Sequence, residues 1–113
     1  MTENTHIPQG LQRFIDTTNK GDDAGFVDAF TMDAVLDDWG RVFLGRDGIA
    51  SWNRTDNIGV QAHFALVDIQ PTDHADTVVA VLTVTGNGYN GTGPMTFVFD
   101  GDRIARLTIA PNG

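Results

Sequence analysis

Two adjacent carboxylates, Asp37 and Asp38, are the residues of this 113-residue chain that first suggest chemistry. They lie at the end of a predicted strand, where neighbouring side chains point to opposite faces, so they cannot act as one dyad. Asp37 shares its alternation with Val35, which predicts that it faces inward, whereas Asp38 is a natural turn residue. A lone carboxylate in an apolar cavity has a raised pKa, because burial disfavours its charged form, and such a group suits general-base catalysis. The hypothesis is that Asp37 is a catalytic base, and the alternative is a surface or turn-capping aspartate.

His63 is the second catalytic candidate, as a polar partner of that base. It lies in a predicted strand on the parity opposite Ala62 and Phe64, so the alternative is a place on the outer face of the sheet. The other histidines, His6 and His74, are too far apart in sequence to suggest a chelating motif. The chain has no cysteine, which excludes a thiolate nucleophile and a zinc–thiolate site. We expect no bound metal.

A glycine-rich segment, residues 86–93, contains the spacing of a dinucleotide-binding fingerprint, Gly86-Asn87-Gly88-Tyr89-Asn90-Gly91. That fingerprint needs a following helix, whose N-terminus receives the pyrophosphate. Here Thr92-Gly93-Pro94 and a predicted strand follow instead. The segment is therefore predicted to be a loop between strands, and no nucleotide or other cofactor is expected.

Aromatic residues are numerous for so short a chain, and most must belong to its core. A subset can line a cavity only if the sheet curves. The expected substrate-binding residues are Phe14, Phe30, Trp39, Trp52, Tyr89, Met95 and Phe97. Tyr89 is also a possible polar partner of the base.

Helices are predicted early in the chain. Apolar residues recur at helical spacing in the first of them: Ile7, Leu11, Phe14 and Ile15. Gly21 is its expected C-cap, and Asp22 the expected N-cap of a second helix that buries Phe26, Val27 and Phe30. A hairpin is predicted over 35–44, with Trp39-Gly40 near its turn, and a third helix after Gly45 carries Ile49 and Trp52 on one face.

Strands dominate from Val60 onward, over 60–69, 77–85, 95–99 and 103–109. The apolar alternation changes parity after Leu66, which predicts a bulge or sharp bend near 65–67. In the strand over 77–85 both parities are apolar, so both of its faces should be covered. The order is α-α-β-β-α-β-β-β-β, an α+β fold in one domain over residues 1–113.

The composition limits the partners. A net charge of −8 argues against nucleic-acid binding, because little on this chain could displace counterions from phosphates. No apolar run approaches the roughly 20 residues that span a bilayer, so no membrane association is expected. The polar amino terminus lacks the layout of a signal peptide, and we expect a cytoplasmic protein.

Several segments, in this order and spacing, resemble the NTF2-like superfamily, particularly its SnoaL-like and ketosteroid-isomerase-like branch. They are Phe14-Ile15-Asp16 to Asn19-Lys20-Gly21-Asp22, Asp33-Ala34-Val35-Leu36-Asp37, Gly45-Arg46-Asp47-Gly48-Ile49 and Phe97-Val98-Phe99-Asp100-Gly101-Asp102-Arg103-Ile104. The resemblance covers nearly the whole chain. It implies a cone, in which a strongly bent, mostly antiparallel mixed sheet and three helices enclose a pocket for a small hydrophobic molecule. It also implies a homodimer through the exposed face of the sheet.

The same resemblance implies an activity only in outline. The strand Asp that abstracts a proton in ketosteroid isomerases matches Asp37, but the oxyanion-binding Tyr and Asp of those enzymes match Phe14 and Met95, which cannot donate hydrogen bonds. SnoaL-like cyclases use an acid–base residue, which we do not match here. Limonene-epoxide-hydrolase-like relatives activate water with two carboxylates bridged by an Arg, for which Asp37, Asp56 and Arg41 are candidates. Two hypotheses follow: an isomerase, cyclase or hydrolase that uses Asp37, or a non-catalytic binding or dimerisation module.

Overall fold

Two short helices open the fold, and the computed structural model describes residues 7–110 of the chain. Helix α1 (Gln9–Lys20) buries Leu11, Phe14 and Ile15 and ends at Gly21, whose φ of 71° gives the left-handed C-cap that was predicted. Helix α2 (Asp23–Asp28) is capped by Asp22, whose side chain accepts a hydrogen bond from the backbone N of Gly25 at 3.0 Å. The helix ends before Phe30, so the prediction that Phe30 lies on it is wrong. Phe30 is buried as the first residue of a strand instead.

A hairpin follows, made of β1 (Phe30–Asp38) and β2 (Arg41–Leu44). Trp39 and Gly40 form its turn, both with positive φ (56° and 89°), as a two-residue type I′ turn requires. Helix α3 (Gly45–Asp56) starts at once and continues into a short 3-10 helix, η1 (Ile58–Val60). A strand was expected from Val60, but Val60 closes η1 and the next strand starts at His63.

Four further strands complete one sheet: β3 (His63–Pro71), β4 (Thr77–Thr85), β5 (Gly91–Asp100) and β6 (Arg103–Ile109). The strand order is β2-β1-β6-β5-β4-β3, in which β1 and β6 are parallel and all other neighbours antiparallel. The register of β3 against β4 shifts between Leu66 and Asp68, which confirms the predicted bulge. Residues 86–90 form a loop between β4 and β5, shorter than the expected loop over 86–93, because residues 91–93 already pair with β4. The α+β class and the mixed, mostly antiparallel sheet are thus confirmed.

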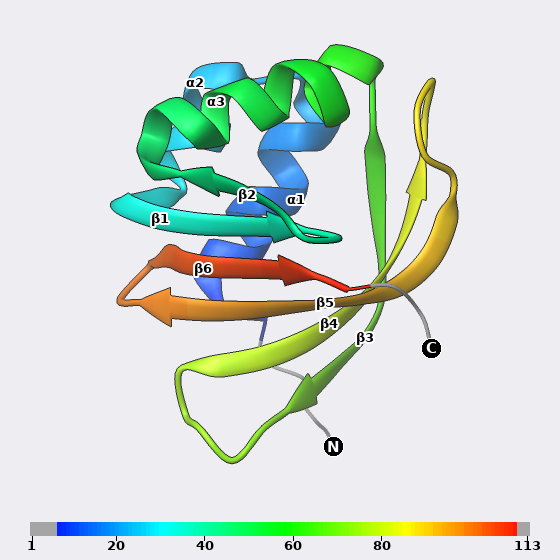
Figure 1. Ribbon diagram of the computed structural model, residues 1–113. Helices are drawn as coiled ribbons and strands as arrows, with labels where there is room; N and C mark the ends of the chain where they lie inside the picture. Colours follow the sequence, from blue (N-terminus) through cyan, green and yellow to red (C-terminus); the bar gives the residue numbers. More distant parts are fainter. Residues whose placement is uncertain (1–6, 111–113) are drawn as a thin grey trace.

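The helices all cover one face of the sheet, and β3, β4 and β5 curve away beyond them, so that the sheet is bent around an interior (Figure 1). Phe14 occupies the middle of the core, with its ring centroid 4.9 Å from that of Phe64 and 5.1 Å from that of Phe97. Phe26 and Phe30 pack on the same ring. This aromatic cluster closes one end of the interior, which leaves the other end between α3 and the far strands for a cavity. No helix within residues 7–110 is long and apolar enough to cross a membrane.

Candidate functional site

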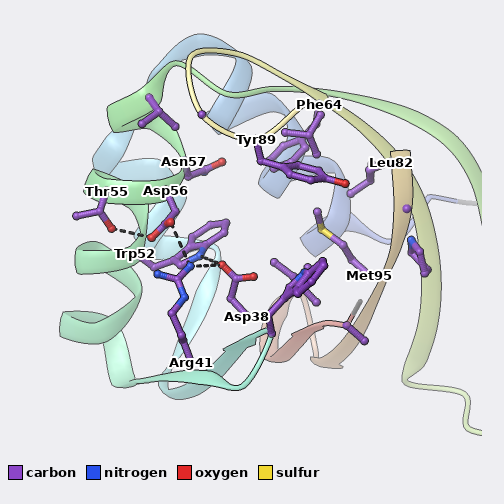
Figure 2. A pocket seen from close by; sticks show the side chains of 18 residues that line it. Asp38, Arg41, Trp52, Thr55, Asp56, Asn57, Phe64, Leu82, Tyr89 and Met95 are labelled. Atoms are coloured by element: carbon purple, nitrogen blue, oxygen red, sulfur yellow. Dashed lines mark hydrogen bonds and ion pairs between the residues drawn. The ribbon is translucent and has the colours of Figure 1, made fainter. Parts of the chain in front are cut away.

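A cavity of about 530 Å³ lies between α3, the β1–β2 turn and the curved part of the sheet (Figure 2). This volume falls within the roughly 300–1,000 Å³ of ordinary small-molecule sites. Most of its wall is apolar, formed by Trp39, Trp52, Val60, Phe64, Leu82, Val84, Pro94, Met95, Ile109 and Ala110, with the glycines Gly88 and Gly93. The groups with polar side chains are Asp38, Arg41, Thr55, Asp56, Asn57 and Tyr89. An apolar wall with a few polar groups is typical of a site for a small, largely apolar molecule.

Asp38 brings a carboxylate into this wall, because it continues the inward alternation of β1. Ala34 and Leu36 are fully buried, and Asp38 follows two residues later on the same face with only 16% of its side chain exposed. Its Oδ2 accepts a hydrogen bond from Nη2 of Arg41 at 2.6 Å and another from Nε1 of Trp52 at 3.0 Å. Figure 2 shows the other carboxylate oxygen directed toward the interior of the pocket. One oxygen is therefore held by protein donors, and its neighbour faces the cavity.

Arg41 joins this carboxylate to a second one. Its Nη2 also lies 3.1 Å from Oδ1 of Asp56, at the end of α3, and Oδ2 of Asp56 accepts from the Thr55 hydroxyl at 2.7 Å. The hydrogen bonds to Asp56 and then to Asp38 raise the pKa of Arg41 above its usual value, so the guanidinium stays charged. The guanidinium also lies over the ring of Phe43, 5.5 Å from its centroid. The site thus contains a carboxylate–guanidinium–carboxylate arrangement with a net charge of −1.

Asp37, the carboxylate expected in the pocket, lies elsewhere. Its Oδ1 accepts a hydrogen bond from the backbone N of Gly40 at 2.8 Å, which caps the hairpin turn, and it is not part of the cavity wall. The expectation that Asp37 faces inward is wrong, because Leu36 rather than Val35 sets the inner face of β1. The turn-capping alternative describes its position.

His63 is also outside the pocket. It is the first residue of β3, opposite Thr85 on β4, and its side chain is exposed on the outer face of the sheet. The buried neighbours Ala62 and Phe64 point the other way. The arrangement therefore gives His63 no contact with the carboxylate pair.

The aromatic candidates divide into two groups. Trp39, Trp52, Tyr89 and Met95 line the cavity, as expected. Phe14, Phe30 and Phe97 are fully buried in the aromatic cluster and do not line it. The reason is that the helices pack directly on this part of the sheet and fill it with rings.

The polar residues that the structure brings together were only partly anticipated. The sequence proposes Arg41 and Asp56 as partners of Asp37, whereas in the structure they pair with Asp38 and with each other. Asp38 shares its parity with Leu36, but the adjacent Val35 is also apolar, so the sequence alone does not favour Asp38 over Asp37. Within residues 7–110, no group of three or more His or acidic side chains is placed to hold a metal ion.

Solved structures of other proteins share this fold. The chain is similar to the Delta 5-3-ketosteroid isomerase from Mycobacterium sp., with a TM-score of 0.78 and 18% identity over 91% of this chain and 90% of that one. It is similar to a Mycobacterium tuberculosis protein in complex with estradiol-17beta-hemisuccinate, with a TM-score of 0.79 and 14% identity over 91% of each chain. It is also similar to a computationally designed 17-OHP binder, with a TM-score of 0.82 and 16% identity over 96% of this chain and 93% of that one. At these identities the likeness establishes the fold alone.

Curated proteins give no significant match. A family model, however, matches residues 11–107, and its description is a SnoaL-like domain. With the curved sheet and the solved relatives, this match confirms the resemblance seen in the sequence: the chain belongs to the SnoaL-like domain family of the NTF2-like fold.

Proposed function

We propose that this protein is an enzyme that binds a small, largely apolar molecule and uses Asp38 as its general base. The observation that carries the proposal is the carboxylate of Asp38 in an apolar pocket wall, with Oδ2 fixed by Arg41 and Trp52. Among residues 7–110 no hydrogen bond occupies Oδ1, so this oxygen is available to accept a proton. A base needs to lie within hydrogen-bond reach of the proton that it takes, and fixing one oxygen aims the other.

The arginine bridge favours hydrolytic use of this base. Proton abstraction beside a carbonyl requires donors that stabilise the oxyanion. On the wall facing α3, Phe64, Leu82 and Met95 have none, and the hydroxyl of Tyr89 is the single donor beside them (Figure 2). When Asp38 takes a proton from water, the hydroxyl attacks an epoxide carbon, the C–O bond breaks, and the alkoxide that forms takes up the proton in turn; Arg41, next to Asp38, is the group placed to stabilise it. The pair of carboxylates bridged by Arg41 has the composition that the limonene-epoxide-hydrolase-like resemblance implies. We therefore place hydrolysis of an epoxide ahead of isomerisation.

The size of the cavity is consistent with a ligand of several rings. A cavity of about 530 Å³ with an apolar lining accommodates such a compound, and two of the similar structures are described with steroid-like ligands. A second candidate function is binding without catalysis. It is favoured by the large exposed fractions of Trp39 (61%) and Tyr89 (62%) at the cavity wall, which provide contact area without any reactive group.

The two functions are separated by matched variants of the adjacent aspartates. We expect Asp38→Asn to lower turnover of the best substrate from a panel of epoxides, lactones and enones by about 10²–10⁴-fold, the usual contribution of a general base. Asp37→Asn removes the same charge from the opposite face of β1 and should keep turnover within about twofold. Asp56→Asn should impair hydrolysis but not isomerisation.

Native mass spectrometry of freshly purified protein gives the substrate class directly, because a retained ligand adds its mass to the chain. Equal turnover by Asp38→Asn and the natural protein would remove Asp38 from the mechanism. Ligand retention without turnover of any panel member would support the binding function instead.

A further inference from the structure

A buried amide in the pocket wall has an oxygen that no described residue satisfies. Asn57 follows the last residue of α3, is fully buried, and lines the cavity. Within residues 7–110 its Oδ1 has no hydrogen-bond partner, and it is the one buried side-chain polar atom there of which this is true. Figure 2 shows the oxygen pointing from α3 toward the pocket space near Tyr89. Because buried acceptors are nearly always paired, this exception needs an explanation.

The direction of the amide is set by a chain of hydrogen bonds that starts at a carboxylate. Asp23 Oδ1 can only accept, so the group 2.8 Å from it on Asn53 must be the Nδ2 donor. Asn53 therefore presents its oxygen to Asn57, whose Nδ2 donates to it at 3.0 Å. The same Nδ2 donates to the Thr18 hydroxyl at 2.9 Å. Turning the Asn57 amide over would set two oxygens against each other, so Oδ1 is forced toward the pocket.

The position of Asn57 is also fixed through its backbone. Its carbonyl oxygen accepts hydrogen bonds from the backbone N of Val60 and of Ala62, both at 3.0 Å. Its own N donates to the carbonyl of Asn53 at 3.3 Å. An acceptor held in this way cannot swing out to find a partner, and it is preorganised for one that comes to it.

We propose that Asn57 Oδ1 is a specificity-determining acceptor, which selects ligands that carry a hydroxyl or N–H donor on an otherwise apolar frame. The inference rests on the proposed ligand pocket and adds to it the polarity of the ligand. A ligand with a donor completes the hydrogen bonding of the amide. An ether or hydrocarbon of the same shape leaves Asn57 Oδ1 buried and unpaired. The cost of this unpaired acceptor discriminates between ligands more strongly than the net gain of one hydrogen bond does. Asp38 and Arg41 act on the reacting atoms, whereas Asn57 sets which molecules enter.

A matched pair of probes tests this, 2-naphthol and 2-methoxynaphthalene. We expect 2-naphthol to bind about tenfold more tightly, a difference equal to about 1.4 kcal/mol. Binding is measured by titration calorimetry, and the ¹³Cγ resonance of Asn57 is followed by NMR. That resonance should move when 2-naphthol is added and stay in place with 2-methoxynaphthalene, a result that needs no variant to fold. Equal affinities, or a ¹³Cγ resonance that ignores both probes, would overturn the inference while leaving the pocket proposal intact. If neither probe binds, both proposals fail.

Variants identify the acceptor. Asn57→Leu should abolish the preference for 2-naphthol, whereas Thr18→Val, which alters the same buried network behind the pocket wall, should keep it. Asp38→Asn is the second control, because its carboxylate could also accept the hydroxyl. If Asp38→Asn loses the preference and Asn57→Leu keeps it, the donor is read by Asp38 and the inference is wrong. If Asn57→Leu does not fold, the NMR result with the natural sequence decides.

Discussion

The indole Nε1 of Trp52 lies 3.0 Å from Oδ2 of Asp38 and donates a hydrogen bond to it, across the gap between α3 and the end of β1. Trp52 itself is 4% exposed, so its ring is fixed by the surrounding core, where it lies 6.1 Å from the ring of Phe26. The carboxylate is consequently oriented from the rigid interior through Trp52 and from the more exposed side through Arg41. The proposed base is therefore held by two separate donors, a buried indole and a more exposed guanidinium.

Removal of the indole donor should therefore affect both stability and the site. We expect Trp52→Phe to lower the free energy of unfolding by about 1–3 kcal/mol, through the lost hydrogen bond and a small cavity. We expect kcat to fall by a larger factor than KM rises. The reason is that the substitution disorders the Asp38 carboxylate but leaves most of the apolar wall unchanged. Urea unfolding and steady-state kinetics measure the two effects. A variant with unchanged kcat would show that Arg41 alone positions the carboxylate.

Phe14 gives a prediction about the ketosteroid-isomerase resemblance. It matches the position of an oxyanion donor in those enzymes, but here its ring is fully buried against Phe64 and Phe97 and does not line the cavity. Phe14→Tyr should not create isomerase activity, and the buried hydroxyl should destabilise the fold by about 1–3 kcal/mol. Phe99→Tyr, at a half-buried ring stacked on Phe97, is the control and should be nearly neutral. Thermal unfolding compares them, and a stable Phe14→Tyr protein with enone isomerase activity would contradict this placement of Phe14.

The elements of this fold were largely predictable because their signals are local. The capping residues Gly21 and Asp22 mark helix ends, and the parity change after Leu66 marks a bulge. Which carboxylate faces inward was not predictable from the sequence. Ala34, Val35 and Leu36 are all apolar, so the residues before Asp37 show no unambiguous alternation. Only the packing of β1 against the helices selects Leu36 for the core, and a shift of one residue exchanges Asp37 for Asp38.

The other residues of the site are brought together by tertiary contacts between segments that are distant in the sequence. Arg41 and Asp56 are 15 residues apart and meet only because α3 runs back over the hairpin. No periodic pattern in the sequence predicts this contact. The orientation of Asn57 likewise depends on Thr18 of α1, 39 residues earlier, and, through Asn53, on Asp23 of α2. Residues with reactive side chains can be proposed from the sequence by their type. Their contact partners can be identified only from the three-dimensional structure.

The homodimer implied by the family resemblance stays a prediction, and the outer face of β4 is where it can be tested. Val79 lies on the face opposite the buried Ala80 and is half-buried in the single chain. We expect sedimentation equilibrium to give about twice the 12.2 kDa chain mass at micromolar concentration. Val79→Lys should weaken the dimer by about tenfold or more, because a charge at an interface core is poorly tolerated. A monomeric natural protein under these conditions would contradict the dimer.

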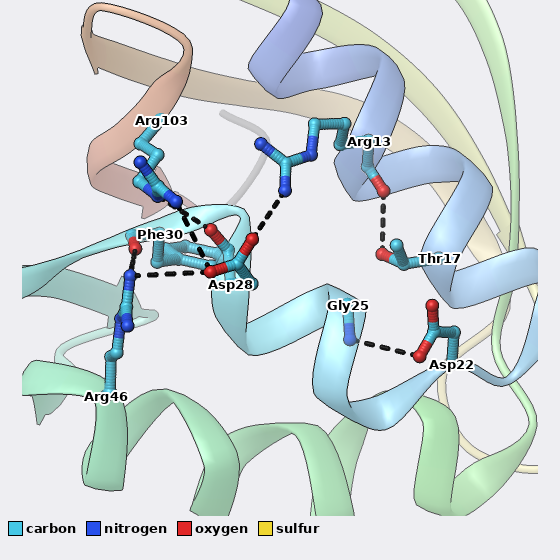
Figure 3. Close-up of polar contacts among 8 residues, drawn as sticks. All are labelled: Arg13, Thr17, Asp22, Gly25, Asp28, Phe30, Arg46 and Arg103. Carbon is cyan, nitrogen blue, oxygen red and sulfur yellow. Dashed lines mark hydrogen bonds and ion pairs between the residues drawn. The ribbon is translucent and has the colours of Figure 1, made fainter.

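Asp28 gives a prediction about acid stability that is separate from the pocket. Its carboxylate is surrounded by Arg13 at 2.7 Å, Arg103 at 3.3 Å and Arg46 at 3.8 Å, which connect α2 to α1, β6 and α3 (Figure 3). The hydrogen bond from Arg13, followed by that from Arg103, lowers the pKa of Asp28 below its usual value. A lowered pKa in the folded state means that the unfolded state binds the proton first as pH falls. The stabilisation is therefore complete above the unfolded-state pKa of about 3.9 and is lost as pH falls through the lower folded-state pKa.

Asp28→Asn should therefore destabilise the protein at pH 7 and make progressively less difference below about pH 4, where the natural carboxylate becomes protonated as well. Denaturant unfolding at a series of pH values measures the difference between the two proteins. Asp16→Asn is the matched control, since Asp16 accepts a hydrogen bond from Gln12 but has no arginine partner among the described residues. In a chain of net charge −8, loss of an isolated carboxylate relieves repulsion, so Asp16→Asn should be neutral or stabilising at pH 7. If Asp28→Asn behaved like Asp16→Asn across the series, the three arginines would contribute nothing through Asp28, as exposed ion pairs often do.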